Sequence, residues 1–368
     1  AGRALGRLLR DQHDLALKIV ESAVETGDAR LLPVVAEAYA GHKPQPTYSP
    51  LDLRALRSVT SSAQPEVQRW APHIVHQVAQ TNPDLALELT ISADFGDSQR
   101  LAKDYLMWIA GDRRIPFDIM GESNVKAILQ KLLPLPRIDD HWVEEFIKKS
   151  LHNHPGLVVD FLVSRVATAQ GRGDWSYSPV PWSSSLRGDW GLMNQPDAFQ
   201  WVRRLFDWAL VQEQAGESVL PWFGDLIRTL CTVNSSDFVE FLRQWISSTG
   251  REGFAVATSL ARQTPQSFVF EQHEFVIWMM RLARSHGADV LRKLSGALYG
   301  AAVSGSRSGT PGEPFPQDIK LRDRASEVLS GLTRQDPAYE LYSDLHRHAI
   351  QSIEVQEEEG RMMADMDE

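Results

Sequence analysis

The feature that most constrains this chain is a recurring helix start, a polar residue or proline followed by a run of apolar residues. It occurs at His13, Pro83 and Pro155, about 70 residues apart, and in weaker form at Ser236 and Pro337. Such residues are favoured at the beginning of a helix, where the first backbone N–H groups have no partner within the helix. The recurrence therefore predicts a regular succession of helices.

Further helix starts, at Pro50 and Gly121, fall between the strong ones, so the underlying unit is about 35–40 residues long and holds two helices. Apolar residues recur at helical spacing along most of the chain, and strict alternation is scarce. A pair of helices of this size cannot bury its apolar face alone. We expect an all-α fold, a right-handed superhelical stack of helical hairpins; an irregular helical bundle is the alternative.

Residues 1–300 resemble HEAT and armadillo-type repeat proteins, although no repeat carries a complete consensus. The resemblance implies an α-solenoid. We expect this solenoid over residues 1–302, with an irregular insertion at 171–192. A Gly/Pro-rich loop with C-terminal capping helices should then fill 303–350, and a frayed acidic tail 351–368.

The sequence SGSRSGTPGEPFPQDI at 304–319, followed by LRDRA at 321–325 and PAYELY at 337–342, is similar to the C-terminal ends of large bacterial proteins. In those proteins a NACHT-like, signal-transducing P-loop ATPase precedes helical repeats. The resemblance implies the sensor end of a cytoplasmic defence or signalling protein, with any ATPase outside this chain. The first residue is Ala1 rather than methionine, which favours a fragment.

Charge and cysteine content disfavour several classes of protein. The net charge is −10, and residues 351–368 contribute −6 of it, so no broad basic face for nucleic acid is indicated. The single cysteine, Cys231, can build neither a disulfide framework nor a zinc site. No apolar run reaches the roughly 18 residues of a membrane span.

Motifs that carry chemistry are incomplete. The string at 305–310 lacks the P-loop lysine, and the zincin-like start at His273 has Ile277 where the second histidine belongs. The histidines around 139–141 and 152–154, like His73 and His76, are explained by helix caps or chance spacing. We therefore expect no catalytic residues, no metal and no cofactor.

Two segments, 171–192 and 303–318, contain too much glycine and proline to be helical. Tryptophan and arginine are the residues most enriched at binding hot spots, so these segments provide the candidate contact residues. The alternatives are that the first folds back onto neighbouring helices and that the second is a simple connector. The candidate residues are Arg172, Trp175, Tyr177, Trp182, Arg187, Trp190, Arg307 and Phe315.

These observations favour a non-catalytic module that recognises another protein, because stacked hairpins present a long surface. A structural scaffold or oligomerisation arm is the alternative, and homo-oligomers fit either hypothesis. A HEAT-like nucleic-acid binder ranks third, since the basic residues are scattered. No membrane association is expected.

Overall fold

The computed structural model describes residues 1–26, 28, 30–42, 45, 47–111, 117, 120–172, 176–181, 190–217, 219–305 and 307–367. In this part of the chain all regular structure is helical, and no strand occurs, which confirms the predicted all-α class. The chain divides into two units, Ala1–Ser184 and Ser185–Glu368. The division falls inside the segment 171–192, where we expect the irregular insertion.

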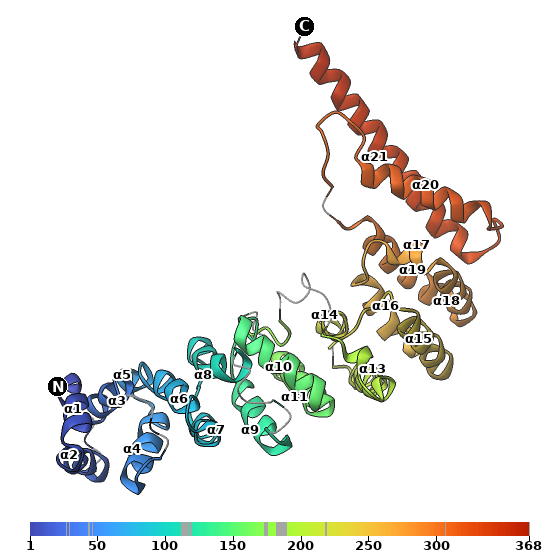
Figure 1. Ribbon diagram of the computed structural model, residues 1–368. Helices are drawn as coiled ribbons and strands as arrows, with labels where there is room; N and C mark the ends of the chain where they lie inside the picture. The colour runs from blue at the N-terminus through green and yellow to red at the C-terminus, as the bar shows by residue number, and fades with distance from the viewer. Residues whose placement is uncertain are drawn as a thin grey trace. The chain divides into compact units, whose positions relative to one another are not determined.

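The first unit consists of two rows of helices, which Figure 1 shows from blue to green. In one row α1, α3, α6, α8 and α10 each contact the next, and in the other α2, α4, α7, α9 and α11 do the same. The helices are α1 Gly2–Asp11, α2 His13–Thr26, α3 Leu32–Ala40, α4 Pro50–Thr60, α5 Pro65–Gln68, α6 Ala71–Ala79, α7 Pro83–Ser92, α8 Gln99–Gly111, α9 Glu122–Leu132, α10 His141–Asn153 and α11 Pro155–Arg172.

The predicted helix starts are confirmed. His13, Pro50, Pro83 and Pro155 are the first residues of α2, α4, α7 and α11, and Ser236 and Pro337 begin helices of the second unit. Side-chain caps precede several of them; the Asn82 side chain, for example, accepts a hydrogen bond from the N–H of Leu85 at 3.1 Å. Local capping chemistry therefore sets where these helices begin.

Hydrogen bonds between successive hairpins recur at the predicted repeat length. A side chain of one hairpin donates to a backbone carbonyl of the hairpin before it, in pairs 37 to 39 residues apart. The acceptors often lie at helix ends, where carbonyls have no partner within the helix. These donor–acceptor pairs are Gln77–Ala40, Lys131–Ala93, Lys149–Ala110, Ser259–Leu220 and Gln272–Asn234.

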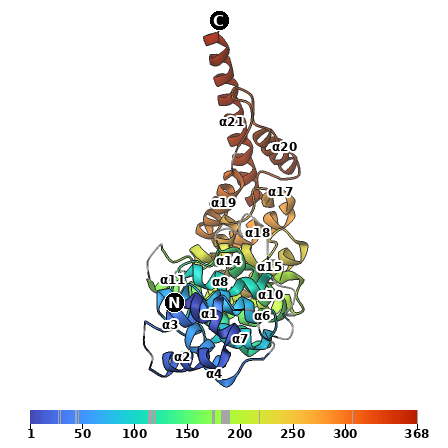
Figure 2. The ribbon, with the colours of Figure 1, turned by 60° about the vertical axis from the view of Figure 1, so that its left-hand side comes forward.

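The second unit begins with the same two-row arrangement and ends with a pair of helices that pack mainly on each other. The row α14, α16, α19 is linked by successive contacts, as is the pair α15 and α18, with α13 packed beside α15 through aromatic rings (Figure 1). The final pair, α20 and α21, lie side by side in Figure 2. The elements are η2 Leu192–Asn194, α13 Ala198–Gln214, α14 Leu220–Leu230, α15 Ser236–Thr249, α16 Gly253–Arg262, α17 Phe268–Glu271, α18 His273–His286, α19 Ala288–Val303, α20 Pro316–Ser330 and α21 Pro337–Asp367.

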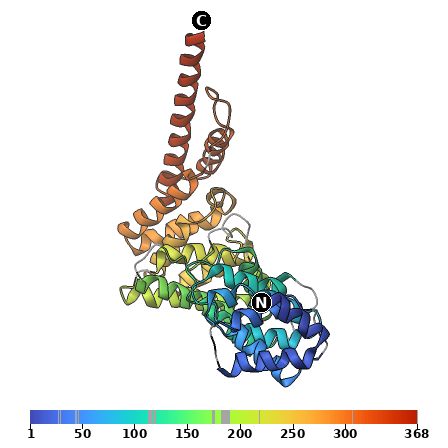
Figure 3. The same ribbon diagram turned by 90° about the vertical axis from the view of Figure 1, so that its left-hand side faces the viewer.

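The predicted frayed tail at 351–368 is wrong over most of its length, because α21 runs without a break from Pro337 to Asp367 (Figure 3). Ile353 and Gln356 are buried, and Gly360 lies so close to the backbone of Gly312 that a Cβ would not fit. The face of α21 that packs inward thus continues beyond residue 351, and its contacts hold the acidic segment in the helix.

Among the described helices, none has both the length and the apolar character that a membrane crossing requires.

Phe206 lies at the centre of the aromatic core of the second unit. Its ring centroid is 5.0 Å from that of Phe223 on α14 and 5.0 Å from that of Trp245 on α15. The side chain is fully buried. It therefore joins three helices of two successive hairpins.

Replacing Phe206 with alanine should lower the free energy of unfolding by about 3–5 kcal/mol, because the substitution leaves a cavity between three helices. Urea denaturation followed by circular dichroism measures the change. Val211→Ala is the matched control, since Val211 lies on the same helix but is 57% exposed. Equal effects of both substitutions would contradict this description of the core.

Candidate functional site

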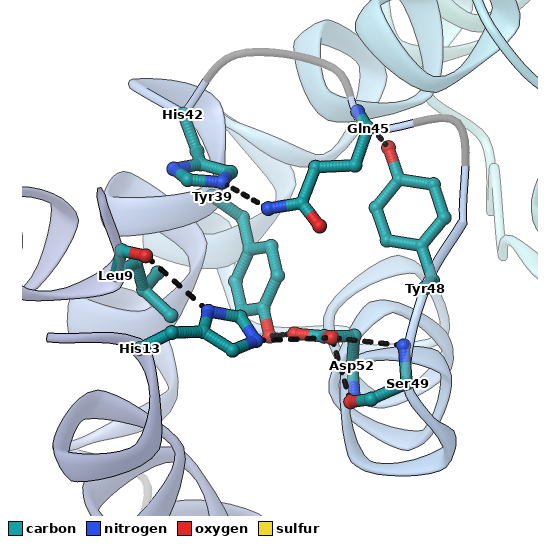
Figure 4. Close-up of polar contacts among 8 residues, drawn as sticks. All are labelled: Leu9, His13, Tyr39, His42, Gln45, Tyr48, Ser49 and Asp52. Atoms are coloured by element: carbon teal, nitrogen blue, oxygen red, sulfur yellow. Dashed lines mark hydrogen bonds and ion pairs between the residues drawn. The ribbon is translucent and has the colours of Figure 1, made fainter. Parts of the chain in front are cut away.

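One polar cluster of the first unit surrounds Asp52, a buried residue in the first turn of α4 (Figure 4). Tyr39 Oη donates to Asp52 Oδ1 at 2.5 Å, and Ser49 Oγ donates to Oδ2 at 2.6 Å. His13 Nε2 lies 3.8 Å from the same Oδ2. Burial, together with the carboxylate, raises the pKa of Tyr39 far above its usual range, so its hydroxyl remains a donor.

This cluster contains a hydroxyl, an imidazole and a carboxylate, but not in the order of a nucleophilic triad. A nucleophile must give its proton to the imidazole, whereas Ser49 Oγ donates to the carboxylate of Asp52. The Asp52 N–H donates to Ser49 Oγ at 3.2 Å and the Ser49 N–H donates to Asp52 Oδ2 at 3.0 Å, and these two bonds form a capping box. The cluster therefore joins α2, α3 and α4. We did not predict this cluster from the sequence, although Ser49-x-x-Asp52 has capping-box spacing.

His42 follows α3 and lies next to this cluster (Figure 4). The side-chain amide of Gln45 lies 2.6 Å from His42 Nε2, and His42 Nδ1 is buried with no hydrogen-bond partner among the described residues. Burial lowers the pKa of His42 below its ordinary 6.5, and nearby His13 lowers it further. The neutral ring is therefore the form that the folded chain favours.

A second polar node surrounds the buried Arg165 of α11. Its guanidinium lies near the C-terminal end of α9, where the helix dipole is negative. Burial lowers the pKa of Arg165 to about 10, which still leaves the group charged at neutral pH. At distances of 2.7 to 3.2 Å it donates to the five backbone carbonyls of Leu132, Leu133, Leu135, Ser178 and Pro179.

The structure places two of the predicted contact residues at this node. Tyr177 is only 3% exposed, and its hydroxyl donates to the carbonyl of Leu133 at 2.8 Å. Its ring centroid lies 4.5 Å from the Arg165 guanidinium and 4.6 Å from that of Arg172. For Tyr177 the structure agrees with the alternative that the segment folds back onto neighbouring helices, whereas Arg172 is the exposed last residue of α11.

Trp190, in the second unit, is also buried, and its backbone N–H donates to the carbonyl of Thr229 at 2.7 Å. Trp175, Trp182 and Arg187 lie outside the described residues. Their role in contacting a partner stays a prediction.

Arg307 and Phe315 bind the segment between α19 and α20 to α21. Arg307 Nε donates to the buried Asp318 at 2.6 Å, and Ser352 and Gln356 of α21 each donate to the same carboxylate at 2.8 Å. The Phe315 N–H donates to Gln356 Oε1 at 2.7 Å. Burial alone would raise the pKa of Asp318, but these hydrogen bonds outweigh it and lower the pKa. This agrees with the connector alternative.

The histidine-containing segments that we weighed as metal sites have other partners. His73 Nε2 lies 3.2 Å from the side-chain amide of Gln77, and Asp140 caps α10 through the N–H of Trp142 at 3.1 Å. Within the described residues, no group of three or more histidine, cysteine, aspartate or glutamate side chains is arranged to hold a metal ion.

The surface is hollowed where helices of neighbouring hairpins meet. One groove has a volume of about 950 Å³ and lies between α19 and α21. A second, of about 660 Å³, lies between α13 and α15, where Phe199 stacks on Phe241. A third, of about 480 Å³, lies between α18 and α20. None of the predicted contact residues that the structure describes lines these three grooves, so the grooves are separate candidates for a binding site.

No family model, no curated protein and no solved structure matches this chain.

The lowered pKa of His42 predicts that the fold is less stable in acid. Its neutral form is favoured in the folded state, so the contribution to stability is complete above pH 6.5 and falls as pH decreases below that value. We expect the urea midpoint to fall less between pH 7.5 and 5 in His42→Gln than in the unsubstituted chain. The exposed His141→Gln is the control; if both variants follow the same pH profile, His42 is not responsible.

Replacing Arg165 with lysine should lower the free energy of unfolding by about 2–4 kcal/mol, because lysine has three donors and cannot reach all five carbonyls. Arg172→Lys should cost less than about 0.5 kcal/mol, since its side chain lies at the surface. Urea denaturation of both variants tests this. A tolerant Arg165→Lys would show that the carbonyls find other partners.

Proposed function

We propose that this chain is a helical-repeat module of the HEAT or armadillo type that recognises another protein. The observation that carries the proposal is the two-row packing within each unit. Contacts between helices run mainly to neighbours in sequence, and helices of both rows also carry exposed residues. Such stacks offer long surfaces on which a partner can lie.

The charges along the open faces favour a protein partner over nucleic acid. In the α13–α15 groove, Arg203 and Arg204 lie with Asp207 and Glu240 beside the exposed ring of Phe199. A surface that follows phosphates needs an excess of basic residues. Mixed charges around an apolar centre are instead typical of protein interfaces.

The resemblance of 304–319 to the ends of bacterial NACHT-like proteins extends this proposal. On that basis the module is the sensor region of a larger cytoplasmic defence or signalling ATPase, and the reaction belongs to another part of that protein. Sequencing the gene around the coding region of this chain tests the extension, because the extension requires the same gene to encode a P-loop domain.

The recognition proposal is tested by capturing a partner on the full chain and measuring its affinity by titration calorimetry after purification. We expect a defined stoichiometry and a Kd below about 1 μM. Trp182→Ala tests the predicted role of that side chain separately, since unchanged affinity would move the contact to the helix faces.

Two outcomes would overturn the proposal. Discrete self-assembly in light scattering, without any captured protein, would favour a structural scaffold. DNA binding that weakens steeply with added salt would favour the nucleic-acid alternative.

A further inference from the structure

The groove of about 950 Å³ between α19 and α21 is bounded by two helices, as a docking site for a third helix would be. Gly296 and Tyr299 of α19 line one side, and Leu341, His348 and Gln351 of α21 line the other. Both walls belong to the second unit, and both are helices longer than three turns. Its volume of about 950 Å³ accommodates several side chains of a partner.

The wall formed by α21 has the spacing of a coiled-coil seam and continues beyond the groove. Its residues follow one another at alternating intervals of four and three, the pattern that a second helix matches with side chains in register. Where the seam leaves the groove, Val355 is 56% and Met362 is 57% exposed. The seam consists of the apolar residues Pro337, Leu341, Val355 and Met362 and the polar residues Asp344, His348, Gln351 and Glu358.

The wall formed by α19 contains two glycines, Gly296 and Gly300, which have no side chains. A Cβ added to Gly296 or Gly300 would meet nothing within 4 Å, so the packing of this chain does not require glycine at either position. Glycine inside a helix is less favourable than alanine, but it allows another backbone to approach closely. The two glycines lie four residues apart, on the same side of α19.

Charge distinguishes between the possible occupants. Inside the groove, Arg292 and Arg347 are balanced by Glu340 and Asp344. Around Val355 and Met362 the exposed neighbours are mostly acidic: Glu354, Glu357, Glu358 and Glu359, with Arg361 as the single base. A second copy of α21 on this surface would bring carboxylates against carboxylates. A helix flanked by lysine or arginine would complement them.

We propose that the helix-docking surface, defined as the α19–α21 groove together with Val355 and Met362, binds an amphipathic helix of a partner protein. The apolar residues of that helix lie at heptad positions, and its flanking residues are basic. This inference rests on the proposed protein-recognition function and names the surface and the chemistry of the partner.

The test uses the full chain and a fluorescein-labelled synthetic peptide of about four heptads, with leucine at positions a and d and lysine at e and g. Lysine flanks prevent the peptide from pairing with itself. We expect saturable binding in fluorescence anisotropy, and no binding of the same peptide with glutamate flanks. Gly296→Leu fills the groove, and the double variant Val355→Ser, Met362→Ser removes the two exposed apolar side chains of the seam without changing charge. Each should weaken binding at least tenfold.

Matched controls separate the docking surface from general effects. Gly171→Leu replaces a glycine of α11 whose Cβ would also meet nothing within 4 Å, and Met107→Ser removes a 39%-exposed methionine of α8. Both should bind the lysine-flanked peptide as the unsubstituted chain does. Circular dichroism melting curves should show that Gly296→Leu is folded, because leucine favours the helix more than glycine.

Three results would overturn the inference. The lysine-flanked peptide fails to bind, the groove and seam variants bind as tightly as the controls, or the glutamate-flanked peptide binds equally well. A dimer in sedimentation velocity that disappears in the Val355→Ser, Met362→Ser variant would assign the surface to a second copy, which also contradicts the proposal.

The two proposals can fail separately. A natural partner whose affinity is unchanged by Gly296→Leu and by the double variant would leave protein recognition standing and reject this surface. Peptide binding that depends on the surface, in a chain that captures no protein, would support this surface and reject the protein-recognition proposal.

Discussion

The structure depends on the burial of each hairpin's apolar face against the next hairpin. A pair of short helices cannot remove enough apolar surface from water by itself, so stability comes from contacts between neighbours. Phe206 shows this, because its ring touches helices from two successive hairpins. The side-chain hydrogen bonds to carbonyls 37 to 39 residues earlier follow from the same stacking.

Buried polar clusters join helices to one another and to the segments between them. Asp52 joins three helices at the start of α4, Arg165 holds residues 176–181 against the end of α9, and Asp318 ties the segment before α20 to α21. Each is a buried charge that several hydrogen bonds compensate, which burial in a low-dielectric interior requires. These hydrogen bonds explain the three buried charges as parts of the fold, and the grooves between helices are the surfaces on which our binding proposal rests.

The long helix α21 contributes both to the core of the second unit and to the proposed docking surface. One of its faces packs inward through Leu345, Ile353 and Gln356, and this packing keeps the helix intact to its acidic end. A neighbouring face carries Val355 and Met362, which are open to solvent. The same helix can thus be held by its own chain on one side and offer two exposed apolar side chains on another.

The sequence by itself determined the all-α class and the positions of helix starts such as Pro83 and Pro155, because capping and helical periodicity act over a few residues. Only the tertiary structure decided that Tyr177 and Trp190 are buried, since their exposure depends on residues far along the chain. The groove likewise brings Gly296 of α19 beside α21, a juxtaposition that packing between hairpins creates and that no local pattern encodes.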